Sequence, residues 1–222
     1  MDSRKSRFID FLVDAGALTF GDFVTKSGRK TPYFINTGRF DTGKKIFELG
    51  KHYAAHIEQN IGSDYDLLFG PAYKGVPLAV ATASALYAQF GREVGYCFDR
   101  KEEKSHGDKG KLVGYPISDG SKIILVEDVI TAGTTLKEIV PFLRNIADIT
   151  IVSVVIAVNR CERGSSNIGA VEEIGAELGV KIDPLVTVHD IFKYLSSDNE
   201  SGLVLDAQMQ KRLEQYISDY GV

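Results

Sequence analysis

Two almost uninterrupted apolar runs, IILV at residues 123–126 and IVSVVIAV at residues 151–158, most constrain what this chain can fold into. They lack the polar alternation of a half-exposed strand, and are typical of a parallel sheet that is covered on both faces. Amphipathic stretches with helical spacing separate the strand-like runs along the chain. Strands that alternate with helices are joined by right-handed crossovers. We therefore predict an α/β fold with a largely parallel central sheet flanked by helices.

The other elements follow from the same patterns, with glycine and proline as stop signals. The stretch PYFI at residues 32–35 is expected to be an edge strand that follows a polar loop. No repeat or linker divides the chain, so we expect a single domain of residues 1–222. Helices are predicted from about residue 8 to 15 and at 46–57, 75–90, 135–146, 168–178, 189–195 and 207–220, and strands at 66–69, 94–98, 123–126, 150–158 and 185–188.

The composition narrows the function classes. A hydrophobic content of 44% is ordinary for a globular protein of 222 residues, and a net charge of -4 argues against broad nucleic-acid binding. Cys97 and Cys161 stand alone, without a CxxC pair, which excludes a structural zinc site and favours reducing surroundings. The N-terminal residues mix charges with apolar side chains, unlike a signal peptide, and no stretch could span a membrane. A cytoplasmic protein is therefore predicted.

The strand at 123–126 ends in two adjacent carboxylates, Glu127 and Asp128, followed by the small polar run TAGTT at 131–135. Ligands of a parallel sheet bind where strands end and helices begin, and a glycine-containing turn before a helix is suited to a phosphate monoester. Two carboxylates would repel that phosphate unless they bind hydroxyl groups or Mg²⁺ a few ångströms away. A ribose 5-phosphate satisfies both requirements; the alternative is an acidic strand end with a threonine N-cap.

Residues 99–114, DRKEEKSHGDKGKLVG, form a highly charged, glycine-containing segment. The segment is too polar to belong to the core and too long for a tight turn. We therefore expect a mobile loop. Taken alone, such a loop is most often solvated surface.

Five stretches in order carry a resemblance to a known family. VEDVITAGTT resembles the 5-phosphoribosyl 1-diphosphate (PRPP) motif of type I phosphoribosyltransferases. Together with FVTKSGRKTPYFINTG, FGPAYKGVPLA, FDRKEEKSHGDKG and VNRCERG, it is similar to the orotate phosphoribosyltransferases, essentially from Phe8 to Val222. The resemblance implies the type I phosphoribosyltransferase fold. It also implies a small hood, formed mainly by residues 1–40 and the C-terminal part, and a mobile catalytic loop at about 99–114.

The resemblance also implies the PRPP site. Glu127 and Asp128 would hold the ribose hydroxyls, and the turn after them the 5-phosphate. Glycines at both ends of the loop 70–75 let its backbone approach a ligand closely, and in relatives an unusual cis peptide is found near this point. Of these residues, Lys101, Lys104, His106 and Asp128 would be catalytic. The full set for PRPP is Lys26, Tyr73, Lys74, Arg100, Lys101, Lys104, His106, Glu127, Asp128, Val129, Ile130, Thr131, Ala132, Gly133, Thr134 and Thr135.

For orotate the resemblance implies a flat apolar wall and an arginine. Phe34 would supply the wall, whereas Ile35, where relatives usually have a second aromatic residue, would contribute mainly its backbone. Arg160 suits the orotate carboxylate because a guanidinium can bind a carboxylate through two hydrogen bonds. Taken alone, it is a surface residue that balances Glu162. Lys26 and Thr131 complete the set of contacts, and a nucleophilic role for Cys161 is not favoured.

The activity implied is the transfer of the phosphoribosyl group of PRPP to orotate, giving orotidine 5′-phosphate and diphosphate in UMP biosynthesis. Mg²⁺ would be held mainly by PRPP and water, without a direct protein ligand. The loop would close over the neighbouring subunit, so a homodimer with shared sites is expected. Three alternatives stay open: a different base, a PRPP-sensing regulator, or one half of a bifunctional pyrimidine enzyme. For the last, we expect no covalently attached decarboxylase, although a separate partner is not excluded.

Overall fold

The computed structural model describes residues 2–25, 28–104, 110–130, 132–165 and 167–222, except for the side chains of 103, 104 and 110. The strands are β1 (Leu18–Val24), β2 (Lys30–Ile35), β3 (Leu67–Phe69), β4 (Gly95–Lys104), β5 (Gly110–Gly114), β6 (Lys122–Val129), β7 (Thr150–Asn159) and β8 (Ile182–Thr187). The helices are α1 (Ser3–Asp14), α2 (Gly43–Asn60), α3 (Gly75–Phe90), α4 (Thr134–Ile146), α5 (Ala170–Leu178), α6 (Val188–Leu195) and α7 (Ala207–Tyr220), with a short 3₁₀ turn η1 (Thr37–Arg39).

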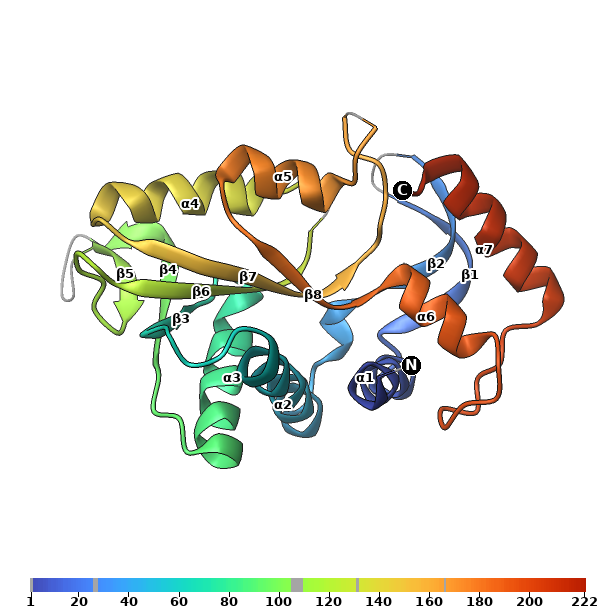
Figure 1. Ribbon diagram of the computed structural model, residues 1–222, viewed down its shortest axis with the longest axis horizontal. Helices are drawn as coiled ribbons and strands as arrows, with labels where there is room; N and C mark the ends of the chain where they lie inside the picture. Colours follow the sequence, from blue (N-terminus) through green and yellow to red (C-terminus); the bar gives the residue numbers. More distant parts are fainter. Residues whose placement is uncertain (1, 26–27, 105–109, 131, 166) are drawn as a thin grey trace.

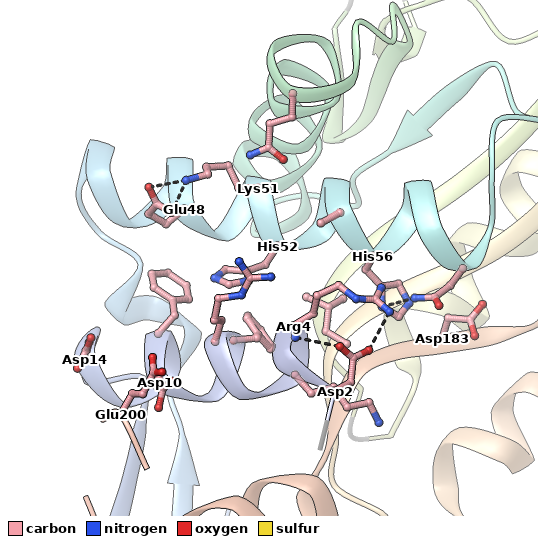
Figure 2. Close-up of a pocket in the computed structure, with 18 of the residues that line it drawn as sticks. Asp2, Arg4, Asp10, Asp14, Glu48, Lys51, His52, His56, Asp183 and Glu200 are labelled. Carbon is pink, nitrogen blue, oxygen red and sulfur yellow. Dashed lines mark hydrogen bonds and ion pairs between the residues drawn. The ribbon is translucent and has the colours of Figure 1, made fainter. Parts of the chain in front are cut away.

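The central sheet has the strand order β5-β4-β3-β6-β7-β8. All neighbouring strands are parallel except β5, which is antiparallel to β4 at one edge. Helices α2 and α3 lie on one side of the sheet, and α4 and α5 on the other (Figure 1). The predicted α/β architecture with a largely parallel sheet is confirmed.

The apolar run of β6 shows why this strand carries no polar alternation. Ile124 and Val126 belong to the hydrophobic cluster under α2 and α3, whereas Ile123 and Leu125 belong to the cluster under α4 and α5. All four side chains are fully buried. Successive residues of a strand point to opposite faces, so a strand covered on both sides must be apolar at every position.

A separate antiparallel hairpin, β1–β2, lies beside the sheet together with α6 and α7 (Figure 1). Tyr33 of β2 is fully buried and makes edge contacts with Phe192 of α6 and Tyr216 of α7, at ring distances of 5.4 and 5.7 Å. Residues near both ends of the chain therefore share one aromatic core. This core fixes the position of β2 relative to the C-terminal helix.

The charged segment 99–114 differs from the loop that its composition predicts. Strands β4 and β5 cover most of it as an antiparallel pair, in which Phe98 lies opposite Val113 and Asp99 opposite Leu112. An irregular register follows between Asp99 and Lys104. The strand pairing was missed because the few apolar residues are outnumbered by charges, which are tolerated at the exposed edge of a sheet. Residues 105–109 lie outside the described part of the chain.

Strand β1 was not predicted, and several element boundaries differ, of which two examples follow. Strand β8 begins at Ile182 rather than near residue 185, and it includes Pro184. Proline lacks an N–H group, but β8 is an edge strand, where one side of the backbone needs no partner. Helix α5 begins at Ala170, two residues later than expected. Among the described residues, no helix has the length and apolar character needed to cross a membrane.

Candidate active site

The carboxyl ends of β3, β6 and β7 meet at one edge of the sheet. They lead into the loop at 70–75, the turn at 130–133 and the segment at 160–164. Ligands of open parallel sheets bind at this edge. The three segments singled out by the sequence are therefore neighbours, although they are far apart along the chain.

The two carboxylates at the end of β6 have different protonation behaviour. Glu127 is only 8% exposed, and its Oε1 accepts a hydrogen bond of 3.0 Å from the backbone N–H of Asp128. Burial, together with the neighbouring charge of Asp128, raises the pKa of Glu127 to about 8. At neutral pH, Glu127 is therefore mainly protonated in the ligand-free protein, while Asp128 is ionised.

Asp128 is held by two residues from other elements, which we call the Asp128 clasp. Lys74 Nζ lies 2.8 Å from Asp128 Oδ2, and the hydroxyl of Thr37 donates to the same oxygen. Lys74 Nζ also donates to Thr37 Oγ1 at 2.9 Å. Burial alone would raise the pKa of Asp128, but the hydrogen bonds from Lys74 and Thr37 outweigh it and hold this pKa below its ordinary value.

The raised pKa of Glu127 predicts a pH-dependent stability difference between the wild type and Glu127→Gln. Between pH 5 and 8, native Glu127 keeps a proton that the unfolded chain has released. The stability that this proton supports is therefore present at low pH and is lost as the pH rises through about 8. Relative to the variant, the wild type should lose roughly 4 kcal/mol between pH 5 and pH 9, in urea unfolding measured at each pH. A difference that does not change with pH would contradict the assignment.

The turn after β6 leads into α4 without a side-chain cap among the described residues. Gly133 occupies the N-cap position with φ of 68°, and a Cβ there would lie 2.5 Å from Ile174 Cδ1. Among the described residues, the N–H groups of the first turn of α4 therefore have no side-chain cap at the ligand edge. Backbone N–H groups at a helix N-terminus attract anions such as phosphate. Val129 and Ile130 pack inward, whereas Ala132 and Thr134 are exposed and Thr135 is half-buried.

The loop 70–75 is closed by contact between its own ends. A Cβ on Gly70 would lie 2.0 Å from the carbonyl oxygen of Gly75, and a Cβ on Gly75 would lie 2.7 Å from the carbonyl carbon of Gly70. Both glycines are thus required by the fold of the loop itself, because a Cβ at either position would clash with the opposite end of the loop. The peptide bond between Ala72 and Tyr73 is cis. Tyr73 and Lys74 are exposed at the tip.

The β2 strand presents Phe34 to one side and Ile35 to the other. Phe34 is 40% exposed, and its ring stacks on Phe23 at 5.5 Å, so it can supply a flat apolar surface. Ile35 is 8% exposed and belongs to the hydrophobic core. The side chain of Ile35 is therefore not available to a ligand, so any contact with one would have to come from its backbone.

Arg160, directly after β7, forms an ion pair with Glu162. This pair was the simplest interpretation of the sequence. The pair is not on the surface, however: the side chain of Arg160 is 12% exposed, and its guanidinium lies 4.6 Å from the centre of the Tyr33 ring. The neighbouring Cys161 is buried, and burial raises the pKa of its thiol to about 11. The thiol is therefore neutral at pH 7, which argues against a nucleophilic role.

Some of the predicted site residues lie together in the structure, others lie apart from them, and a few are outside the described residues. Glu127, Asp128 and Lys74 are in one cluster, whereas Lys101 on β4 is exposed and Arg100 is half-buried. The following predicted residues lie outside the described residues: Lys26, His106 and Thr131, and also Lys104, of which only the backbone is described.

Several residues at this edge were missed by the sequence analysis. Thr37 reaches Asp128 from a turn 91 positions away, and nothing in the local sequence signals this contact. The carboxylate of Asp99 accepts a 2.7 Å hydrogen bond from the backbone N–H of Ala72 and thereby supports the loop at 70–75. Its strand position was hidden by the charges around it. Glu162 was noted only as a balancing charge.

The site is suited to a magnesium ion that is carried by a substrate. Within the described residues, no three His, Cys, Asp or Glu side chains are grouped as a metal cage. Glu127 and Asp128 nevertheless provide carboxylate oxygens beside the turn that leads into α4. Mg²⁺ prefers such oxygen ligands and usually keeps several water molecules and substrate phosphates in its shell.

Comparisons with known proteins agree with this site. The family model "Phosphoribosyl transferase domain" matches residues 36–182. The orotate phosphoribosyltransferase of Clostridium acetobutylicum is 45% identical over 223 residues, and the alignment covers 100% of both chains. The orotate phosphoribosyltransferase of Bifidobacterium longum (strain DJO10A) is 46% identical, and the alignment covers 97% of this chain and 96% of that one. The crystal structure of orotate phosphoribosyltransferase from Francisella tularensis superposes with a TM-score of 0.84, at 35% identity, covering 97% of this chain and 100% of that one. The chain therefore belongs to the orotate phosphoribosyltransferase family.

Proposed function

We propose that this protein transfers the 5-phosphoribosyl group of PRPP to orotate, giving orotidine 5′-phosphate and diphosphate in UMP biosynthesis. The observation that carries the proposal is the end of β6. There, two carboxylates stand directly before an uncapped helix N-terminus, in a chain about 45% identical over its full length to orotate phosphoribosyltransferases. Carboxylates for ribose hydroxyls and N–H groups for a 5-phosphate match the two ends of one substrate.

PRPP binding is assigned to the turn and to the two basic segments beside it. Asp128 and Glu127 accept hydrogen bonds from the ribose hydroxyls, and the residues from Val129 to Thr135 surround the 5-phosphate. Tyr73 and Lys74 face the diphosphate, with Lys26, Arg100, Lys101, Lys104 and His106 as further contacts. Mg²⁺, held mainly by PRPP and water, supplies positive charge that offsets the charge of the diphosphate.

The reaction forms a bond between orotate N1 and C1 of the ribose while the bond from C1 to the diphosphate oxygen breaks, and orotate N1 releases its proton to the diphosphate or to solvent. Both electrons of the breaking bond leave with the diphosphate, so negative charge grows there and positive charge grows on the ring. Basic side chains stabilise the leaving group, and the Asp128 carboxylate stabilises the ring. The base rests on Phe34 and the backbone of Ile35, while Arg160 and Thr131 bind it.

A homodimer is supported by an exposed apolar stripe on α3. Val80 and Tyr87 are 36% and 66% exposed, at spacings that place them on one helix face. Tyr73, 74% exposed, lies in the loop before α3 that is assigned to the diphosphate. A partner seated on α3 would therefore approach the active site, as sites shared through the segment 99–114 require. Large apolar side chains exposed on one helix face are candidates for an interaction site.

Replacing Tyr87 with glutamate is expected to shift the protein from dimer to monomer, because a carboxylate would be buried against apolar side chains. Light scattering at low micromolar concentration measures the shift, and activity should fall with it. Val204→Glu serves as a control, since Val204 is also exposed, at 47%, but lies outside α3. A Tyr87→Glu protein that remains dimeric would remove this interface from consideration.

Shared sites can be tested by mixing Lys104→Ala chains with Asp128→Asn chains. If the loop of one chain completes the site of the other, mixed dimers contain one site with both changes and one site with neither. Random mixing should then restore about a quarter of the wild-type activity. Failure to restore activity in demonstrably mixed dimers would overturn the shared site.

The activity itself is tested by following orotate absorbance after addition of PRPP and Mg²⁺. Consumption that needs both additions supports the proposal. A folded protein that binds PRPP but leaves orotate unchanged would retain the sugar-phosphate site and exclude orotate as the base. A cytoplasmic location, which we also propose, is consistent with a biosynthetic enzyme of this type.

A further inference from the structure

Glu162 lies at the centre of a cluster of four side chains beside the base site. Its Oε1 is 2.9 Å from Arg160 Nε, 2.6 Å from Arg160 Nη2 and 2.6 Å from the hydroxyl of Tyr216, while its Oε2 is 3.1 Å from Arg29 Nη1. The three partners come from the segment after β7, from α7 and from the segment before β2. One carboxylate thus joins two cations and a tyrosine from distant parts of the chain.

The guanidinium groups of the cluster are also held by aromatic rings. Arg160 lies 4.6 Å from the Tyr33 ring centre, and Arg29 lies 4.5 Å from that of Tyr220. Stacking on a ring fixes the plane of a guanidinium, and the carboxylate fixes its rotation in that plane. Arg160 presents Nε and Nη2 to Glu162; within the described part of the chain, its Nη1 has no hydrogen-bond partner. That group remains available to a ligand.

The charges of the cluster decide what it can bind. Arg160 and Glu162 alone would form a neutral pair with little attraction for an anion. Arg29 adds a second positive charge, so that the cluster of two arginines and one glutamate carries a net charge of about +1. A single carboxylate on the base matches this charge.

We propose that Glu162 is a positioning residue that orients Arg160 toward the orotate carboxylate, and that Arg29 keeps the cluster cationic. The proposal rests on the function proposed above, in which Arg160 binds orotate. Arg29 and Glu162 act through Arg160 and do not need to touch the base. Tyr216 extends the same support to the C-terminal helix.

Glu162→Gln separates positioning from simple electrostatics, because the two predict opposite changes in the KM for orotate. Loss of a negative charge beside Arg160 would strengthen orotate binding if charge alone mattered. If positioning matters, loss of the carboxylate that orients Arg160 weakens orotate binding instead. We expect the KM for orotate to rise about 10-fold, while the KM for PRPP stays within about 2-fold of the wild-type value. Glu58→Gln is the matched control, since Glu58 binds Arg92 through the same two guanidinium nitrogens, at 3.1 and 2.9 Å, away from the site.

Arg29 variants test the charge. Arg29→Gln should raise the KM for orotate about 10-fold, whereas Arg29→Lys, which keeps the charge, should stay within about 3-fold of the wild type. Arg92→Gln controls for the loss of an arginine from an ion pair. A merely structural cluster would instead lower the unfolding midpoint and change the PRPP and orotate constants together.

The outcomes also separate this proposal from the proposed function. If the wild type does not consume orotate, the function fails. If the wild type consumes orotate but the Glu162 and Arg29 variants keep its KM for orotate, only the cluster proposal fails. If Glu162→Gln does not fold, the KM values for orotate of Arg29→Gln and Arg29→Lys are compared instead. Equal values for these two variants would overturn the role of the charge.

Discussion

Replacing Asp128 with asparagine is expected to lower kcat/KM for PRPP about 10³-fold. Asp128 is the ionised member of the carboxylate pair, because Lys74 and Thr37 hold its pKa low while burial raises that of Glu127 to about 8. Under the proposed function, its negative charge would face the ribose when positive charge develops there. Removing one preorganised electrostatic group from an active site typically costs about 10²- to 10³-fold in rate.

Steady-state kinetics at saturating orotate measure this effect, with thermal unfolding as the check on folding. Asp64→Asn is a matched control. Asp64 is also an aspartate paired with a lysine, at 2.6 Å from Lys122, but it precedes β3 at the opposite edge of the sheet and is 86% exposed. A well-folded Asp128→Asn protein within 10-fold of the wild type would contradict the assigned role.

Replacing Arg160 with alanine is expected to lower kcat/KM for orotate about 10²- to 10³-fold. The change removes the proposed charge-assisted hydrogen bonds to the orotate carboxylate, and it removes two of the three hydrogen bonds to Glu162 Oε1. It also reduces the net charge of the cluster from about +1 to zero, so that the anion is no longer attracted.

The loss should appear with orotate as the varied substrate, while PRPP binding measured by calorimetry stays within about 3-fold of the wild type. Arg144→Ala is a suitable control, because Arg144 donates to the backbone oxygen of Leu178 near the far end of α4. If both substrates were affected equally, Arg160 would be a structural residue rather than the anchor for the base.

The parts of the fold that could be predicted from the sequence are those fixed by short-range patterns. The run at 123–126 is apolar at every position because β6 is covered on both faces, and this pattern needs no knowledge of the partners. The β4–β5 pair was missed because its pairing joins residues whose charges conceal the strand pattern. Apolar content is a weaker guide at an exposed sheet edge than at its centre.

In the site, too, features of adjacent residues could be predicted from the sequence, whereas contacts between distant residues could not. Glu127, Asp128 and the turn after them could be found because they are adjacent in sequence and lie where a strand meets a helix. Thr37, which contacts Asp128, and Arg29, which contacts Glu162 across 133 positions, could not. Such contacts depend on how β2 and η1 are placed against the sheet, and that placement is decided by long-range packing of residues such as Tyr33.

The Asp128 clasp changes how the resting enzyme presents itself to an approaching polyanion. Two adjacent carboxylates would create a repulsive field toward a substrate that carries a phosphate and a diphosphate. In the ligand-free site one carboxyl holds a proton and the other has Lys74 as an internal counterion, so little negative potential extends from the pair. Under the proposed function, ribose hydroxyls would take the place of Lys74 at Asp128, and the ammonium group would be freed within the loop assigned to the diphosphate. One cation can thus mask the acid during encounter and neutralise the leaving group afterwards.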